Sequence, residues 1–339
     1  MLILRNRTQR STIIYHFLLI IIISLWLAFS ITFEPGDGLG TDFYPFYRAG
    51  EAIRAGESPY SDAVVQDMMR VWKVKFASTG FVYPLPAAIG VWPILLLPLP
   101  LATVVWTAIG AAGVFGAVGL AEDWRERVLL PFCFLPVWHA IEMHQATLVW
   151  TAFVVVLIVA MRRRSSWLVG LCVVLLPGKP QVGLLFALAG LLWAWREDKR
   201  SLLWAAGWGM LIWGVSFALQ PTWVQDWIHS LSRHTRLGPV ISLLPWSLVI
   251  LPFTWKLPWY AQIAALQVAI FPASDIYTAL PLLLVWIHIG GWIALLGAGV
   301  SWLWLLAGMP YTITTFWLVM LLPLMAACLW RWRQYRRDA

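Results

Sequence analysis

Polar residues that could carry chemistry are concentrated in one short stretch of a strongly apolar chain. Residues 38–60, GLGTDFYPFYRAGEAIRAGESPY, include Asp42, Tyr44, Tyr47 and Arg48. Asp42 follows GDGLGT, whose glycines let the backbone reach an irregular position near a membrane surface. A carboxylate held there against apolar walls tends to have a raised pKa, which suits a general base or acid. The alternatives are a solvated loop residue or an N-cap for a helix beginning at Tyr44.

Two further polar groups fall at predicted helix ends on the same side of the membrane. EMHQAT places His144 and Gln145 at the outer end of a crossing, and LLPGKPQVG places Lys179 between two prolines where short helices meet. Helices broken at membrane depth generally line a cavity, because their freed backbone groups need partners other than lipid. Lys179 is therefore predicted to face a water-filled site and to bind an anion. Snorkelling of Lys179 and ordinary helix-end roles for His144 and Gln145 are the alternatives.

A third group of polar residues lies in QPTWVQDWIHSLSRHTRLGP, residues 220–239. Its basic residues Arg233, His234 and Arg236 are predicted to lie outside, against the usual bias of basic residues toward the cytoplasm. Guanidinium groups suit phosphate oxygens, so a lipid phosphate or pyrophosphate is a natural partner. Ordinary contact with lipid head groups is the alternative.

The composition of the chain indicates that membrane-spanning helices position these residues. The chain has 339 residues, is 61 % apolar and only 12 % charged, and has a mean hydropathy of +0.76. The run at 11–33 exceeds the length of about 20 apolar residues that crosses a bilayer, and it predicts a retained transmembrane helix. The net charge of +8 is spread over short basic clusters between apolar runs, which favours positive-inside bias over nucleic-acid binding.

The basic clusters determine the predicted topology. RERV, MRRRSS, WREDKR and the C-terminal RWRQYRR should all be cytoplasmic, as should the N-terminus, so an even number of crossings must separate each pair. The proline-rich segment 81–100 is therefore predicted to be juxtamembrane or re-entrant and to stay with the outer loop. Twelve crossings remain, with ten as the alternative: 11–33, 101–120, 128–143, 146–161, 166–177, 181–195, 201–219, 239–254, 258–272, 277–295, 298–309 and 312–330.

The predicted organisation is one all-α integral membrane domain over residues 1–339. A long outer loop at 34–100 carries juxtamembrane helices, including an amphipathic one in YPFYRAGEAIRAG. Core helices follow at 101–219, a second outer loop at 220–238 and C-terminal helices at 239–339. The three cysteines lie in apolar runs without metal-ligand spacing, so no disulfide framework or metal site is expected.

With these residues collected, the chain resembles a known family. TDFYPFYRAGEAIRAGESPY, FVYPLPAAIGVWPILLLPLPLATVVW, HQATLVW and GKPQVGLL resemble, in order, the polyprenyl-phosphate-sugar-dependent glycosyltransferases of family 87, which have the GT-C fold. That family includes polyprenyl-phosphate-mannose α-mannosyltransferases. The likeness covers about residues 38–200. The family often has Gly where this chain has His144, and its usual YPP is YPLP around Tyr83.

The resemblance implies a function and a site. By this likeness Asp42 would be the general base, and Lys179 matches the family's Lys-Pro pair. Independently of the likeness, Lys179 and the group of Arg233, His234 and Arg236 are predicted to contact donor phosphate, because two outer basic clusters flank the proposed cavity. Substrate-binding residues would be Tyr44, Tyr47, Arg48, Tyr83, His144 and Gln145. A hexose such as mannose would move from a polyprenyl-phosphate donor to a glycolipid or glycan acceptor, with inversion, at the outer face of the plasma membrane. No metal, other cofactor or nucleic acid is expected, because the sequence has no DxD pair and the donor is a lipid phosphate.

Two other classes of function stay open. A transporter or lipid flippase would also have many crossings, broken helices and outer charges, although no matching interrupted segments occur in the two halves. A non-catalytic assembly or glycan-binding membrane protein would keep the fold without the base.

Overall fold

The computed structural model describes residues 42–72, 80–121, 124–237 and 240–338, and the predicted crossing at 11–33 lies outside these ranges. Within them the chain is all-α, and the one β feature is an isolated antiparallel bridge between Ile241 and Ala273. The protein is an all-α polytopic membrane protein, as predicted.

The described part of the predicted outer loop at 34–100 contains short helices. They are α2 (Tyr44–Arg54), α3 (Asp62–Trp72), α4 (Leu85–Gly90) and α5 (Trp92–Leu95). α2 is amphipathic, because Phe46, Ala49 and Ala52 are buried on one face while Arg48 and Glu51 keep exposure on the other. Segment 81–100 contains two short helices and no long one, since its prolines lack the N–H that a continuous helix needs.

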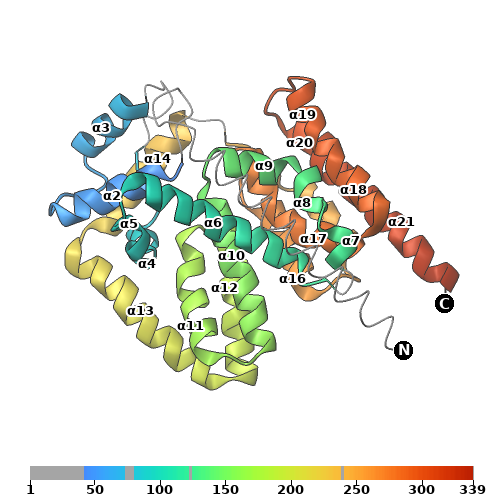
Figure 1. Cartoon of the computed structure of the whole chain (residues 1–339), viewed down its shortest axis with the longest axis horizontal. Helices are drawn as coiled ribbons and strands as arrows, with labels where there is room; N and C mark the ends of the chain where they lie inside the picture. Colours follow the sequence, from blue (N-terminus) through green and yellow to red (C-terminus); the bar gives the residue numbers. More distant parts are fainter. Residues whose placement is uncertain (1–41, 73–79, 122–123, 238–239, 339) are drawn as a thin grey trace, which may run out of the picture.

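The central helices pack side by side. α6 (Leu99–Val118), α10 (Ala146–Arg162), α11 (Ser166–Leu175), α12 (Pro180–Glu197) and α13 (Lys199–Leu219) are the long apolar ones in this part. Figure 1 shows α10 to α13 together, with α2, α3 and α14 (Trp223–Leu237) gathered at one end. Short helices α7 (Trp124–Arg127), α8 (Leu130–Cys133) and α9 (Leu135–Glu142) connect α6 to α10.

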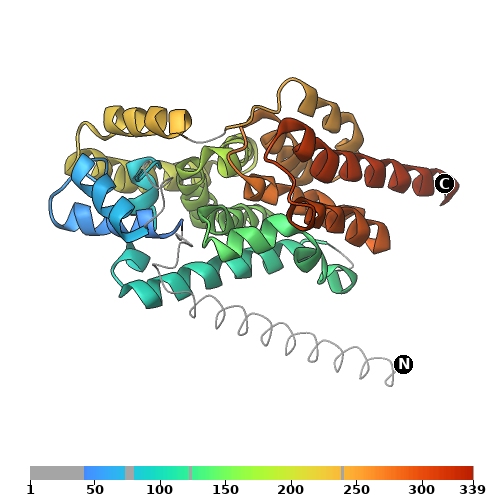
Figure 2. The same cartoon turned by 90° about the horizontal axis from the view of Figure 1, so that it is seen from above.

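The C-terminal part consists mostly of short helices. They are the 3₁₀-helix η2 (Trp246–Ile250), α15 (Leu251–Thr254), α16 (Trp259–Ile270), η3 (Ile276–Leu282), α17 (Leu283–Ile289), α18 (Gly291–Gly299), η4 (Val300–Trp302), α19 (Leu303–Leu306), α20 (Ile313–Phe316), the π-helical turn η5 (Trp317–Leu321) and α21 (Leu322–Asp338). Figure 2 shows α21 extending beyond the rest of the bundle at the C-terminus.

Few of these helices are long enough to cross a membrane alone. In the described part of the chain, Leu99–Val118, Lys199–Leu219 and Ile313–Gln334 have the required length and apolarity. Helices α9 and α10 together would make a fourth span, but they are bent by 119° relative to each other. The shorter apolar helices Ser166–Gly178, Trp259–Ile270, Ile276–Ile289 and Gly291–Leu306 complete the bundle.

Some predicted crossings differ from the observed helices. The segment 239–254 is not one continuous helix: residues 241–245 form a bridge and a turn before η2, because Pro245 interrupts the apolar run. The segment 128–143 is divided at Phe134, the N-cap of α9, whose extended backbone (φ −100°, ψ 101°) separates α8 from α9. The predicted helix 277–295 ends at Ile289, where Gly290 adopts φ +70°.

Candidate active site

Asp42 is connected to the start of α10 by two hydrogen bonds. Its backbone N–H donates to the Met143 carbonyl at 2.8 Å, and its carboxylate accepts from Nε2 of Gln145. The residue at the N-cap of α2 is Phe43, and no side chain caps this helix. The alternative of Asp42 as a helix cap is therefore wrong, and its half-buried carboxylate points to another part of the chain.

A tight turn between α9 and α10 positions Gln145. His144 has φ +47° in this turn, a conformation that glycine adopts most readily. The buried His144 ring bonds to Thr107 Oγ1 through Nδ1 at 2.8 Å, and its carbonyl accepts from Trp106 Nε1 at 3.0 Å. His144 thus fastens the turn to α6, while Gln145 beside it faces Asp42 and Lys179.

Gln145 lies between a carboxylate and an ammonium group. Its Oε1 accepts from Lys179 Nζ at 2.8 Å while its Nε2 donates to Asp42. The two neighbours fix which way the amide points, because an ionised carboxylate only accepts and an ammonium only donates. We refer to Asp42, Gln145 and Lys179 as the polar row.

Lys179 is buried at the break between α11 and α12. It follows the 3₁₀-helix η1 (Leu176–Gly178), and its side chain is 5 % exposed. Nζ also donates to the Tyr83 hydroxyl at 3.3 Å and lies 5.1 Å from the centre of the Tyr83 ring and 5.5 Å from that of Tyr277. The ammonium is enclosed by polar and aromatic partners, so snorkelling to the interface does not describe it.

The helix break beside Lys179 is stabilised by specific contacts. Gln267 of α16 donates to the Pro180 carbonyl at 2.7 Å and accepts from the Leu185 N–H at 2.9 Å. Gly178 leaves no room for a side chain, because a Cβ would lie 2.7 Å from the Trp150 ring. The broken geometry predicted from the two prolines is thus held by neighbouring helices.

Burial sets the electrostatics of Asp42. Enclosure in an apolar setting raises the pKa of the Asp42 carboxyl from 3.8 to about 6, and the negative charge of Asp275 adds to this effect. The positive charges of Lys179 and His139 oppose it. A carboxylate with this proton affinity is ionised at neutral pH and still basic enough to accept a proton.

A second carboxylate group lies near Asp42 and was missed in the sequence. Asp275, at the N-cap of η3, approaches His139 Nε2 at 3.3 Å, and Glu142 approaches His139 Nδ1 at 3.6 Å. The ring of Tyr277 stacks on His139 with centres 6.1 Å apart. The available signal was that Asp275 is the only acidic residue between positions 227 and 337.

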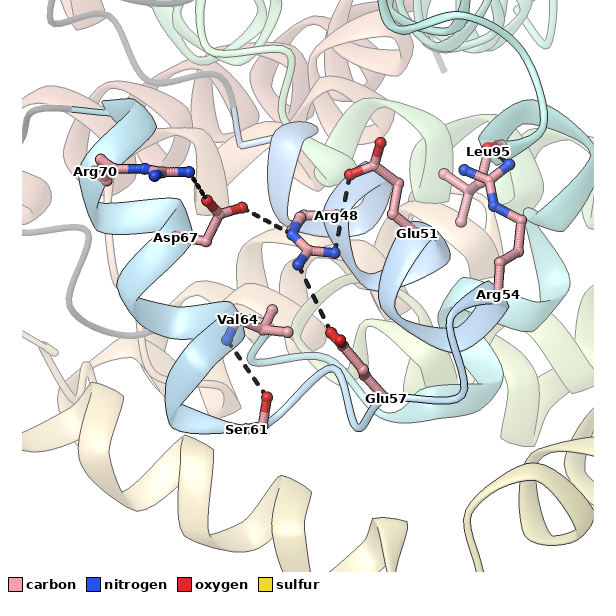
Figure 3. A network of polar contacts seen from close by, with 9 residues as sticks. All are labelled: Arg48, Glu51, Arg54, Glu57, Ser61, Val64, Asp67, Arg70 and Leu95. Carbon is pink, nitrogen blue, oxygen red and sulfur yellow. Dashed lines mark hydrogen bonds and ion pairs between the residues drawn. The ribbon is translucent and has the colours of Figure 1, made fainter.

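Arg48 belongs to a separate ionic network, drawn in Figure 3. Its Nε donates to Asp67 at 2.9 Å, and its other nitrogens lie 3.9 Å from Glu51 and 3.8 Å from Glu57. Arg70 approaches the second oxygen of Asp67 at 2.5 Å. This network joins α2 to α3, and no described contact links it to the polar row.

The tyrosines of α2 have different surroundings from the polar row. Tyr44 is buried, and the charges of Asp67 and Glu51 raise the pKa of its hydroxyl after the larger effect of burial. Tyr47 packs against Phe43 with ring centres 6.2 Å apart. Of the residues proposed to bind substrate, the structure brings Tyr83 and Gln145 to Asp42 and Lys179.

The basic residues of the second outer loop lie on α14. Arg233 donates to Asp62 of α3 at 3.1 Å, and His234 and Arg236 follow on the same helix. α14 lies over the segment that carries Tyr83, since Trp227 Nε1 donates to the Val82 carbonyl at 2.9 Å and Ser230 to the Phe81 carbonyl at 2.9 Å. No described contact connects Arg233 with Lys179.

No curated protein and no solved structure matches the chain. Among the residues that the structure describes, no three or more His, Cys, Asp or Glu side chains are grouped to hold a metal ion. The family model for Glycosyltransferase family 87 matches residues 81–286, more than half of the chain, and this range includes Tyr83, Gln145, Lys179 and Asp275. The chain therefore belongs to glycosyltransferase family 87 and is a membrane glycosyltransferase.

Proposed function

We propose that this enzyme transfers a hexose such as mannose from a polyprenyl-phosphate donor to a hydroxyl of a glycolipid or glycan acceptor at the outer membrane face. The observation that carries the proposal is the polar row, in which a carboxylate of raised pKa and a buried ammonium group are held apart by one amide. A base and a cation at neighbouring positions are what transfer from a sugar phosphate needs.

The residues at the two ends of the polar row, Asp42 and Lys179, have different roles in the reaction. Asp42 accepts the proton of the acceptor hydroxyl as its oxygen forms a bond to C1 of the sugar. The bond between C1 and the phosphate oxygen breaks, and the phosphate leaves with the electron pair. The ammonium of Lys179 stabilises the charge on that phosphate. Attack from the side opposite to the leaving group inverts the anomeric centre.

Gln145 keeps the two charges available to substrates. A direct contact between Asp42 and Lys179 would lower the basicity of the carboxylate and occupy the ammonium. The amide instead satisfies both groups with hydrogen bonds while it separates them. Substrate can therefore approach each charge without first breaking an ion pair.

Two helix N-termini support phosphate binding in the same place. α10 begins after Gln145 and α12 begins after Lys179, so the positive ends of both helix dipoles point toward the polar row. Their other ends carry basic clusters, Arg162–Arg164 on α10 and Arg196 on α12. Positive-inside bias puts those clusters in the cytoplasm, which supports an outer location for the site.

The basic residues of α14 complete the proposed donor site. Arg233, His234 and Arg236 would attract the lipid phosphate. The Arg233–Asp62 pair is partly exposed, with side-chain exposures of 30 % and 78 %, so its loss to a phosphate contact costs little.

The experiment uses the full chain in lipid nanodiscs with polyprenyl-phosphate mannose and the corresponding glucose lipid. We expect sugar transfer to a glycolipid acceptor that persists in EDTA and gives a product of inverted anomeric configuration. The same protein is also reconstituted in sealed vesicles, where a transporter or flippase would move the sugar lipid across the membrane without forming a new glycosidic bond. Transport without transfer would refute the proposal.

A further inference from the structure

We propose that Asp275, positioned by His139, binds hydroxyl groups of the transferred sugar and so sets the sugar specificity of the enzyme. This inference rests on the proposed function. It assigns a role to a carboxylate that is separate from the polar row but adjoins it.

The Asp275 carboxylate is fixed in place without being saturated. Its Oδ1 accepts from the Ile276 backbone N–H at 2.5 Å, and its Oδ2 faces His139 Nε2 at 3.3 Å. A carboxylate has about four acceptor directions, and the side chain of Asp275 is 38 % exposed. Acceptor directions are therefore available to a ligand from a group that is already oriented.

His139 holds that orientation from the other side. Both of its ring nitrogens face carboxylate oxygens, Nε2 toward Asp275 and Nδ1 toward Glu142. The stacked Tyr277 ring limits rotation of the imidazole. His139 is 27 % exposed and Glu142 is 35 % exposed, so the three polar side chains share one accessible surface.

The charge of this surface favours a neutral polyol over a phosphate. Two carboxylates around one imidazole leave it negative when all three groups are charged, and an anion would be repelled. Vicinal hydroxyls of a hexose can donate to the acceptor directions that remain free on the carboxylates. Buried or half-buried groups that pair with substrate hydroxyls discriminate strongly against analogues lacking them.

The position beside Lys179 identifies the sugar as that of the donor. Tyr277 is two residues from Asp275, and its ring lies 5.5 Å from the Lys179 ammonium. The charges of Asp275 and His139 also act on Asp42. If Lys179 holds the donor phosphate, the sugar joined to that phosphate extends toward Tyr277 and reaches Asp275, with C1 near the base.

The test compares transfer from polyprenyl-phosphate mannose with transfer from each of its monodeoxy forms. For the wild type, removing the hydroxyl bound by Asp275 should lower kcat/KM roughly 10- to 100-fold, the loss of one hydrogen bond to a charged group. In Asp275→Asn, removing the same hydroxyl from the donor should lower kcat/KM less than about threefold, because the hydrogen bond to that hydroxyl is already weakened. Asn keeps the acceptor oxygen that faces the Ile276 N–H.

Asp198→Asn is the matched control, since Asp198 caps α13 through the Arg200 N–H as Asp275 caps η3. Its deoxy penalties should equal those of the wild type. If Asp275→Asn does not fold, His139→Gln carries the test and should reduce the penalty for the same hydroxyl. If a folded Asp275→Asn protein loses as much kcat/KM with every deoxy donor as the wild type does, the inference is overturned. Sugar transfer by that protein would still uphold the proposed function. A wild type that transfers no sugar overturns the proposed function and this inference together.

Discussion

At the scale of single residues, the raised pKa of Asp42 predicts how the rate of sugar transfer depends on pH. Burial raises the pKa of this carboxyl to about 6, and only the ionised form can act as a base. The rate of transfer should therefore fall as the pH decreases through that value. Measured kcat/KM between mildly acidic and neutral pH should show this acid limb. A limb at the ordinary value of 3.8 would show that Asp42 is not the titrating base.

Lys179 should act mainly on the donor. Lys179→Met removes the ammonium and keeps an apolar chain of similar length, so the loss of charged hydrogen bonds of about 1.5–3 kcal/mol should lower kcat/KM for the donor about 10- to 100-fold. Lys199→Met is the control, because Lys199 lies at the start of α13, beside the Trp195 ring. Equal donor kinetics for the two variants would contradict a role for Lys179 in phosphate binding.

The sequence predicted the chemical types at the site better than their connections. Asp42, Gln145 and Lys179 were singled out by a glycine-rich approach and by helix ends, and the structure brings all three together. Asp275 and His139 were missed, because 136 residues separate them and only the fold juxtaposes them. Arg48 was expected at substrate because it lies in the same motif, but helix periodicity turns its side chain toward α3.

At the scale of elements, the contact between α6 and α10 depends on a small residue. A Cβ on Gly113 would lie 2.4 Å from Cα of Ala152, and backbone at such a contact cannot move away easily. Gly113→Ala should destabilise the protein by about 1–3 kcal/mol through overpacking. Thermal unfolding in detergent should show a lower Tm.

Gly207→Ala in α13 is the matched control for that experiment. No atom lies within 4 Å of a Cβ added there, so the better helix propensity of alanine should leave Tm unchanged or slightly higher. A Gly113→Ala variant with the same Tm as Gly207→Ala would mean that close packing of α6 on α10 does not limit stability.

Element boundaries could be predicted where apolar runs are long and uninterrupted. α6, α10 and α13 begin and end within a few residues of the predicted crossings. The prediction of one helix at 239–254 was wrong, because hydropathy does not show that Pro245 redirects the backbone or that Ile241 pairs with Ala273. Such long-range pairing depends on the packed state and leaves no periodic signal.

At the scale of the whole molecule, we expect α2 and the basic ends of α10 and α12 to lie on opposite sides of the membrane. Single cysteines at Glu57, which is 54 % exposed, and at Arg164, which is 70 % exposed, test this in a background without the native cysteines. An impermeant maleimide added to intact cells should label position 57 and not position 164. Labelling of position 164 from outside would contradict this topology.

The central claim is that Asp42 is the base of a sugar transfer, and Asp42→Asn tests it most directly. The substitution keeps the shape of the side chain and removes its proton acceptor, so single-turnover transfer from bound polyprenyl-phosphate mannose should fall by roughly 10²- to 10⁴-fold. Donor binding and Tm should stay close to those of the wild type, because the Asp42 backbone bond to Met143 is retained. Transfer at nearly the wild-type rate by a well-folded Asp42→Asn protein would contradict the claim.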